Sequence, residues 1–208
     1  MPGMMKVRRL VAVGLAVSLL PAVAAAQGMK MGQAKMSTAR MTRMMKGWPT
    51  PSKEAAMAMV KKYGAPMHMS EHMAMWGKTG QWKRTIVYDY EVNHQFPGPH
   101  TDVMQQWIDM RVPPDMFDDL ATYDGSVVVE RTNGEISARC DKEGANFLAL
   151  NLAYDIVSGK RSPDDARKMY AEQIMAMKAG KPAPYTEKLL FTPAMGGTSD
   201  PDKPAAMP

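Results

Sequence analysis

The sequence predicts an α+β fold in which several helices pack on a small antiparallel sheet. Three observations support this prediction. Residues 82–92 alternate between two sets of side chains, as a half-buried strand does. Residues 126–140 have the pattern of a hairpin around Asn133-Gly134. The remaining segments show helix caps and apolar stripes with a helical period, so strands and helices share one core.

The first 26 residues have the pattern of a cleavable signal peptide. Lys6 and two arginines precede an apolar run over residues 10–20, and alanines 24–26 supply the small residues that cleavage requires. The run is about half the roughly 20 residues needed to span a bilayer. We therefore expect a periplasmic or secreted protein with no integral membrane segment after cleavage.

Residues 27–47 are predicted to be a disordered, methionine-rich arm, because they show no hydrophobic period beyond their methionines. Residues 27–63 contain eight Lys or Arg and one Glu, whereas the rest of the mature chain is net acidic. Such a basic arm either contacts an anionic surface or is simply solvated and flexible. Export and the acidic folded part argue against a nucleic-acid partner.

Residues 48–192 are expected to form a single α+β domain that begins with a helix over residues 53–63. Ser52 is its expected N-cap, and Gly64 stands where the helix would end. The strand over residues 82–92 comes next, followed by a loop rich in Pro and Gly. Thr101 and Asp102 are then predicted to cap a helix that runs to about Met110, and residues 115–122 a short helical piece.

The hairpin is predicted to close through a two-residue type I′ turn, because Asn-Gly suits the two positive φ angles of that turn. This turn fixes the expected pairs as Arg131 with Ile136, Val129 with Ala138, and Val127 with Cys140. Cys140 is the only cysteine, so no internal disulfide can form. Its neighbours are mostly apolar, and we expect it to be buried.

Two more helices are predicted toward the C-terminus. Residues 147–157 are apolar nearly all round, which is typical of a helix buried on several sides. Ser162 and Pro163 open the other helix, and Gly180 closes it. Residues 182–191 are expected to be extended, and residues 193–208 to form a disordered tail.

Methionine is the compositional outlier, with 23 residues, of which 12 lie between positions 29 and 75. Soft thioether sulfur favours Cu(I), and imidazole also suits copper. Thioethers need no deprotonation and form no disulfides, so they remain usable in an oxidising compartment. The sequence therefore predicts an exported protein that binds or buffers Cu(I). The candidate ligands lie in the densest cluster, residues 67–76, and are His68, Met69, His72, Met73 and Met75.

The conformation of residues 66–76 decides which of these donors converge. A helix would align His68, His72 and Met75, whereas a strand would place Met73 with Met75 on one side. The combination of methionines, histidine and a nearby Trp76 is similar to the ligand set of small periplasmic copper and silver metallochaperones. The spaced methionines also look like the Met-rich segments of periplasmic copper-resistance proteins. This resemblance concerns composition and implies no shared fold or site.

A second group of candidate ligands lies in the loop that follows the strand of residues 82–92. His94, His100 and Asp102 fall within nine positions and suit zinc or Cu(II), or His100 could serve as the general base of a hydrolase. The structural alternative is that His94 ends a strand and Asp102 serves a helix N-terminus. A fold that brought this loop beside residues 68–75 would unite all four histidines.

Other interpretations of the methionines remain open. Methionine fills irregular cores well, and a Met-rich surface can dock a protein partner without any metal. The alternative function is therefore a metal-free exported accessory protein. The sequence contains no Gly-rich phosphate loop, nucleophile elbow, paired-cysteine motif or His-Glu-x-x-His helix, so an enzyme is not favoured.

Overall fold

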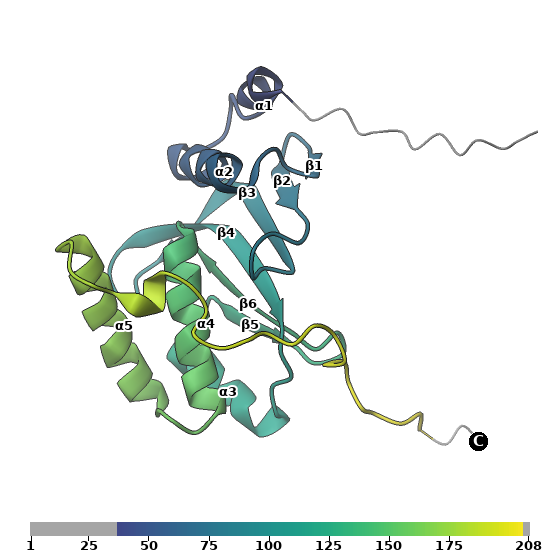
Figure 1. Cartoon of the computed structure of the whole chain (residues 1–208), viewed down its shortest axis with the longest axis vertical. Helices are drawn as coiled ribbons and strands as arrows, with labels where there is room; N and C mark the ends of the chain where they lie inside the picture. Colours follow the sequence, from purple (N-terminus) through teal and green to yellow (C-terminus); the bar gives the residue numbers. More distant parts are fainter. Residues whose placement is uncertain (1–36, 206–208) are drawn as a thin grey trace, which may run out of the picture. The chain divides into compact units, whose positions relative to one another are not determined.

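A computed structural model describes residues 37–205, which form an antiparallel sheet with helices on one face. The α+β fold predicted from the sequence is confirmed (Figure 1). The predicted signal peptide, residues 1–26, and the arm up to residue 36 lie outside the described residues.

The sheet has six strands in the order β1-β2-β3-β4-β6-β5, and every neighbouring pair is antiparallel. The strands are β1 (His68–Met69), β2 (Met73–Trp76), β3 (Arg84–His94), β4 (His100–Asp109), β5 (Val127–Glu130) and β6 (Glu135–Cys140). The helices are α1 (Thr38–Met44), α2 (Thr50–Tyr63), α3 (Phe117–Tyr123), α4 (Glu143–Val157) and α5 (Pro163–Lys178), with short 3-10 turns at Pro114–Met116 and Pro184–Thr186.

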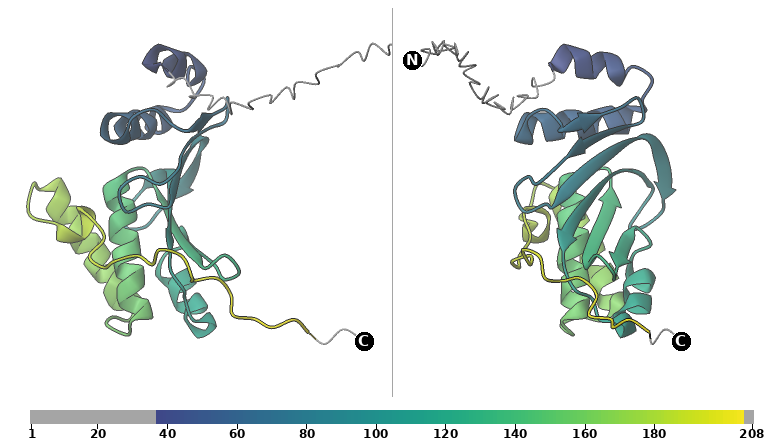
Figure 2. Two further views of the ribbon diagram at one scale, coloured as in Figure 1. Left: turned by 45° about the vertical axis from the view of Figure 1, so that its right-hand side comes forward. Right: turned by 90° about the vertical axis from the view of Figure 1, so that its right-hand side faces the viewer.

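The sheet has an inner face, which carries Val87 and Met104, and an outer face, which carries Ile86 and Gln105. Helices α2 and α4 pack on the inner face, and α5 packs against α4 (Figure 2). No helix lies across the outer face in either view of Figure 2. This one-sided packing explains why strand residues alternate between buried and partly exposed.

The core has two connected parts that correspond to the two covering helices. One surrounds α4, which is buried almost all round as its apolar sequence predicts, and includes Trp82 stacked on Phe147 with ring centroids 4.6 Å apart. The other lies under α2 and includes Met59, Trp76 and Met104. The predicted start of α5 is confirmed, because the Ser162 hydroxyl accepts a hydrogen bond from the Asp165 amide. In α2, however, Ser52 is a buried residue inside the helix, which begins at Thr50 after Pro49.

The helix predicted over residues 101–110 is wrong, because this segment is strand β4. Its even-numbered residues face the helices, but two of them, Asp102 and Gln106, are polar and fully buried. Gln106 donates a hydrogen bond to Thr85 and accepts one from Asn146, which explains how the amide is tolerated there. Polar residues at buried positions hide the two-residue period on which strand prediction relies.

The hairpin of β5 and β6 is confirmed, but its predicted register is wrong by two residues. Val127 pairs with Ala138, and Val129 with Ile136, around a four-residue loop, Arg131–Gly134. Among the described residues only glycines have a positive φ, so Asn133 cannot supply the first position of a type I′ turn. A shift of two residues leaves each side chain on its expected face. Cys140 is buried as predicted, opposite Met104.

The disorder predicted for residues 27–47 does not hold for residues 38–44, which form α1. Met41 and Met45 are almost completely buried and join Trp48 in the part of the core under α2. Their spacing of four and then three residues is that of one helical face. Methionine is a core-forming residue here, as it is at Met59.

The C-terminal segment also departs from the prediction, because residues 194–200 contact the sheet. Ala194 bridges to Asp109, and the Arg111 guanidinium donates to the backbone carbonyls of residues 197–199. Gly134, with φ of +67°, lies so close to Thr198 that a Cβ atom on Gly134 would stand 2.1 Å from the Thr198 backbone.

The extended segment predicted at residues 182–191 is interrupted by the 3-10 turn Pro184–Thr186. Within residues 37–205, no helix combines the length and apolarity needed to cross a membrane.

The packing of α1 can be tested by Met41→Ala. Because the Met41 side chain is fully buried, its truncation should lower the free energy of unfolding by about 2–5 kcal/mol. Chemical denaturation measures this change. Met175→Ala, at a methionine that is 71% exposed on α5, is the control and should change stability by no more than about 0.5 kcal/mol. Equal, small effects at both positions would mean that α1 does not pack on the domain.

Candidate metal sites

The methionine- and histidine-rich segment over residues 67–76 is extended, so the helical alternative is wrong. It forms the hairpin of β1 and β2, with His68 opposite Met75 and Met69 opposite Ala74. Two tryptophans fix this hairpin to the domain. The indole of Trp48 donates to the Glu71 carbonyl at 2.6 Å, and that of Trp76 donates to the Gly64 carbonyl at 2.9 Å. The turn is closed by the Ser70 hydroxyl, which accepts from the amides of residues 72 and 73.

The hairpin places three of the predicted soft donors together on the outer face of the sheet. His68 is the cross-strand partner of Met75, which in turn lies opposite Ile86 of β3. Met73 lies two residues before Met75 and therefore on the same face. We call His68, Met73 and Met75 the Met–His patch. His68 and Met73 are exposed and Met75 is partly buried, so the patch opens to solvent at the edge of the sheet.

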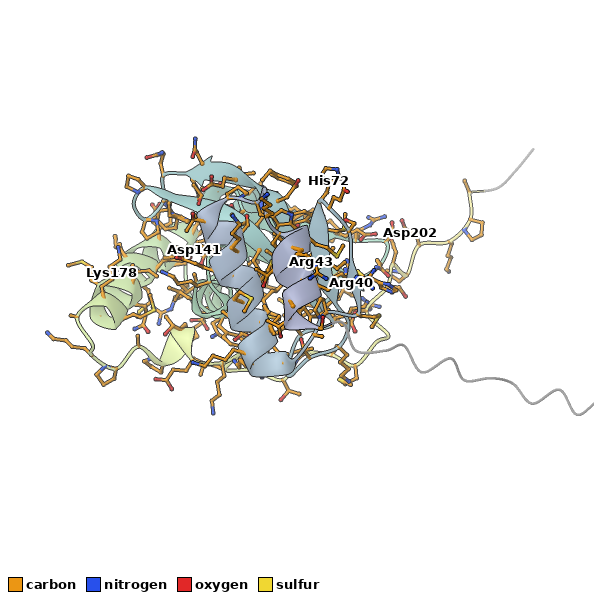
Figure 3. All side chains as sticks on the ribbon, turned by 90° about the horizontal axis from the view of Figure 1, so that it is seen from above. Arg40, Arg43, His72, Asp141, Lys178 and Asp202 are labelled. Carbon is orange, nitrogen blue, oxygen red and sulfur yellow. The ribbon has the colours of Figure 1, made fainter. Side chains whose placement is uncertain are left out.

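The other two predicted donors of this segment lie elsewhere. Met69 is paired with the fully buried Ala74, so it faces inward, where it packs against the part of the core under α2. His72 is in the turn, and its Nδ1 lies 2.7 Å from Asp89 Oδ2. Figure 3 shows His72 at the rim of the molecule, well separated from Lys178 of α5. The hydrogen bond and the negative charge of Asp89 raise the pKa of His72 above its ordinary value.

The remaining two predicted ligands, His94 and His100, belong to the inner face. They are cross-strand partners at the open end of β3 and β4, with ring centroids 4.9 Å apart. Asp102, two residues further along β4, is fully buried beside them. One donor atom from each of these three residues lies within 4.8 Å of the others. We call His94, His100 and Asp102 the inner cluster.

The four histidines do not meet in one centre. Val92 pairs with Asp102 and His94 with His100, so the inner cluster faces the helices, whereas the Met–His patch faces away from them. A shift in register along β3 between Val87 and Val92 brings His94 to the inner face. Among residues 37–205, the inner cluster is the single group of three or more His, Cys, Asp or Glu side chains close enough to hold an ion.

Two further side chains lie beside the inner cluster, and no pattern in the sequence predicts them. Ser126 donates a hydrogen bond to Asp102 Oδ2, and Asp124 Oδ1 lies 3.8 Å from His94 Nε2. Both residues precede β5, about thirty positions along the chain from the histidine loop. Only the pairing of β4 with β6, and of β6 with β5, brings them to this end of the sheet.

Comparison with known proteins identifies no relative. No protein-family model, no curated protein and no solved structure matches this chain.

The pairing of His72 with Asp89 predicts a measurable titration. Because Asp89 stabilises the charged imidazole, the pKa of His72 should lie above its ordinary value of about 6.5. His72 is charged below this raised pKa, and the ion pair is lost as the pH rises through it. NMR titration of the metal-free protein measures the shift. Asp89→Asn should return the pKa of His72 toward the ordinary value; an unchanged titration would show that the two side chains do not pair in solution.

Proposed function

We propose that this protein is an exported metal-binding protein that binds or buffers Cu(I) through the Met–His patch. The observation that carries the proposal is the cross-strand pairing of His68 with Met75, with Met73 beside them on the same exposed face. Two thioethers and one imidazole form a donor set that favours Cu(I) over harder ions.

The spacing of the three residues suits a shared ion. Directly opposed residues in an antiparallel pair have Cβ atoms about 4.5–5.5 Å apart, and residues two apart on one strand are separated by about 7 Å. Methionine has three flexible side-chain torsions, so the sulfur atoms of Met73 and Met75 can turn toward the His68 ring without moving the backbone. Met69 and His72 are left out of this set, because one faces the core and the other is held by Asp89.

The location of the patch suits uptake and release. It lies at the edge of the sheet, where β1 is only two residues long, and no helix crosses the outer face in the views of Figure 2. An ion held there would stay within reach of solvent or of a second protein. Thioethers form no disulfides, so they can still bind Cu(I) in an oxidising compartment. This property agrees with the export that the predicted signal peptide implies.

The alternative function, docking of a protein partner without metal, uses the outer face of the same sheet. Met73 on β2 and Val128 on β5, at opposite ends of this face, are exposed apolar side chains, 40% and 51% accessible. Such side chains can pack against a partner. The two functions differ in whether the purified protein takes up Cu(I) by itself.

The proposal is tested by competition for Cu(I) against a chromogenic chelator, under anaerobic reducing conditions. The mature protein should withdraw Cu(I) from the chelator. Met73→Leu with Met75→Leu removes both sulfur atoms at nearly constant volume and should weaken Cu(I) affinity by at least about 10-fold, as should His68→Ala.

Met175→Leu provides the matched control, because Met175 is exposed on α5, away from the patch. It should leave Cu(I) affinity unchanged. If the wild-type protein does not compete for Cu(I), or if the double methionine variant competes equally well, the copper proposal fails and the docking alternative is favoured.

A further inference from the structure

We propose that His94, His100 and Asp102 bind a divalent transition-metal ion, of the zinc or Cu(II) type, at a site separate from the Met–His patch. This inference does not rest on the proposed Cu(I) function, because the inner cluster lies on the opposite face of the sheet and contains no thioether. Two imidazoles and one carboxylate are a usual protein ligand set for such ions, with further positions open to water.

The first argument concerns the proton on His100. Its Nδ1 lies 2.9 Å from the carbonyl oxygen of Gly98, which can only accept, so Nδ1 carries the proton. In the neutral ring, Nε2 then has a lone pair, and this atom is buried without a hydrogen-bond partner. It faces Asp102 Oδ1 at 3.2 Å, and that oxygen is also buried without a partner. Two buried acceptors that face each other repel unless a proton or a metal ion lies between them.

His94 also lies between two carboxylates, although its Nδ1 has the Ser126 hydroxyl 3.4 Å away. Its Nδ1 lies 3.4 Å from Asp102 Oδ2 and its Nε2 lies 3.8 Å from Asp124 Oδ1. Whichever nitrogen lacks the proton in the neutral ring therefore faces a carboxylate oxygen. The backbone amide of Ser126 already donates to Asp124 at 2.8 Å, and the Ser126 hydroxyl donates to Asp102. These bonds orient the two carboxylates without neutralising them.

The buried negative charge around the inner cluster also favours a bound cation. Asp102 is completely buried and Asp124 is nearly so. Among residues 37–205, no Lys or Arg side chain forms an ion pair with either carboxylate, and the cationic side chains nearest to them are the histidines His94 and His100. Two buried carboxylates without a fixed cation are costly, and a divalent ion supplies the missing charge.

The distances and the surroundings fit an ion of this class. In a tetrahedral site with bonds of about 2.0–2.1 Å, neighbouring ligand atoms are about 3.3 Å apart, close to the 3.2 Å between His100 Nε2 and Asp102 Oδ1. The longest separation in the cluster, up to 4.8 Å, requires one side chain to move on binding. Gly98 orients the His100 ring and Ser126 orients the Asp102 carboxylate, as outer-shell partners do.

Two cavities lie beside the site. His100 is among the lining residues of both, and their volumes are about 640 Å³ and 230 Å³. The loop that carries Gly98 is held in place by Phe96, whose ring is covered by the Arg167 guanidinium at 3.7 Å and lies against Tyr170. The loop beside His100 is therefore held rigidly, and the two cavities lie next to the buried donor atoms.

The test is titration of the chelator-treated mature protein with Co²⁺ and Zn²⁺, which bind thioethers poorly. We expect one equivalent of Co²⁺ with visible ligand-field absorption, displacement by Zn²⁺, and a metal-dependent rise in melting temperature. His94→Ala and His100→Ala should each lower the affinity by at least about 100-fold, and Ser126→Ala by about 10-fold. Met73→Leu with Met75→Leu should leave Co²⁺ binding unchanged, just as His100→Ala should leave Cu(I) binding unchanged.

The competing explanation is that His100 becomes protonated instead. A proton on Nε2 would point at Asp102 Oδ1, 3.2 Å away, and this contact with Asp102 raises the pKa of His100. In that case the wild-type protein would bind neither Co²⁺ nor Zn²⁺, and NMR would show a charged His100 ring near neutral pH. That result, or unchanged Co²⁺ binding in both histidine variants, would overturn the proposal. If the histidine variants do not fold, the wild-type cobalt spectrum and the Ser126→Ala titration decide the outcome.

Discussion

The antiparallel pairing of β3 with β4 is the constraint on which the candidate sites depend. β3 is the longest strand, and it pairs with β2 on one side and β4 on the other. Pairing with β2 aligns the Met–His patch on the outer face, whereas the register beyond Val92 places His94 opposite His100 on the inner face. The register shift between these two stretches allows one strand to serve both faces.

The two donor sets differ in environment as well as in chemistry. The Met–His patch has neutral, soft donors that lose little by being exposed, and Met73 and His68 are left in solvent. The inner cluster contains the buried carboxylate of Asp102, and Asp124 lies beside it. Burial of both carboxylates is costly, and their neutral hydrogen-bond donors are the hydroxyl and the backbone amide of Ser126. Exposure suits exchange of an ion, while burial and a fixed outer shell suit retention.

Features that depend on local chemistry could be predicted from the sequence. The Ser162 cap, the buried helix α4, the hairpin near Asn133 and the burial of Cys140 all follow from neighbouring residues. The secondary-structure predictions are wrong where tertiary contacts determine the conformation of the segment. β4 carries Asp102 and Gln106 at buried positions, and their partners lie more than twenty residues away. Met41 and Met45 belong to the arm predicted to be disordered, but their four-residue spacing is that of a helix face, which joins the part of the core under α2.

The candidate sites show the same contrast between features that neighbouring residues determine and features that tertiary contacts determine. The sequence identified six of the residues that the two sites use, because histidine and clustered methionine are conspicuous. It could not choose between helix and strand for residues 66–76, since both conformations gather soft donors. It gave no indication of Ser126 or Asp124, whose proximity to the histidines depends on the order of four strands.

The contact of the C-terminal segment with the sheet has a practical consequence for handling this protein. Arg111 holds three consecutive carbonyl groups of residues 197–199, and the backbone of Thr198 lies against Gly134 in the β5–β6 loop. Shortening the chain before residue 200 would uncover that loop and leave the guanidinium without acceptors. An affinity tag is therefore better appended after the final residue than substituted for the last dozen.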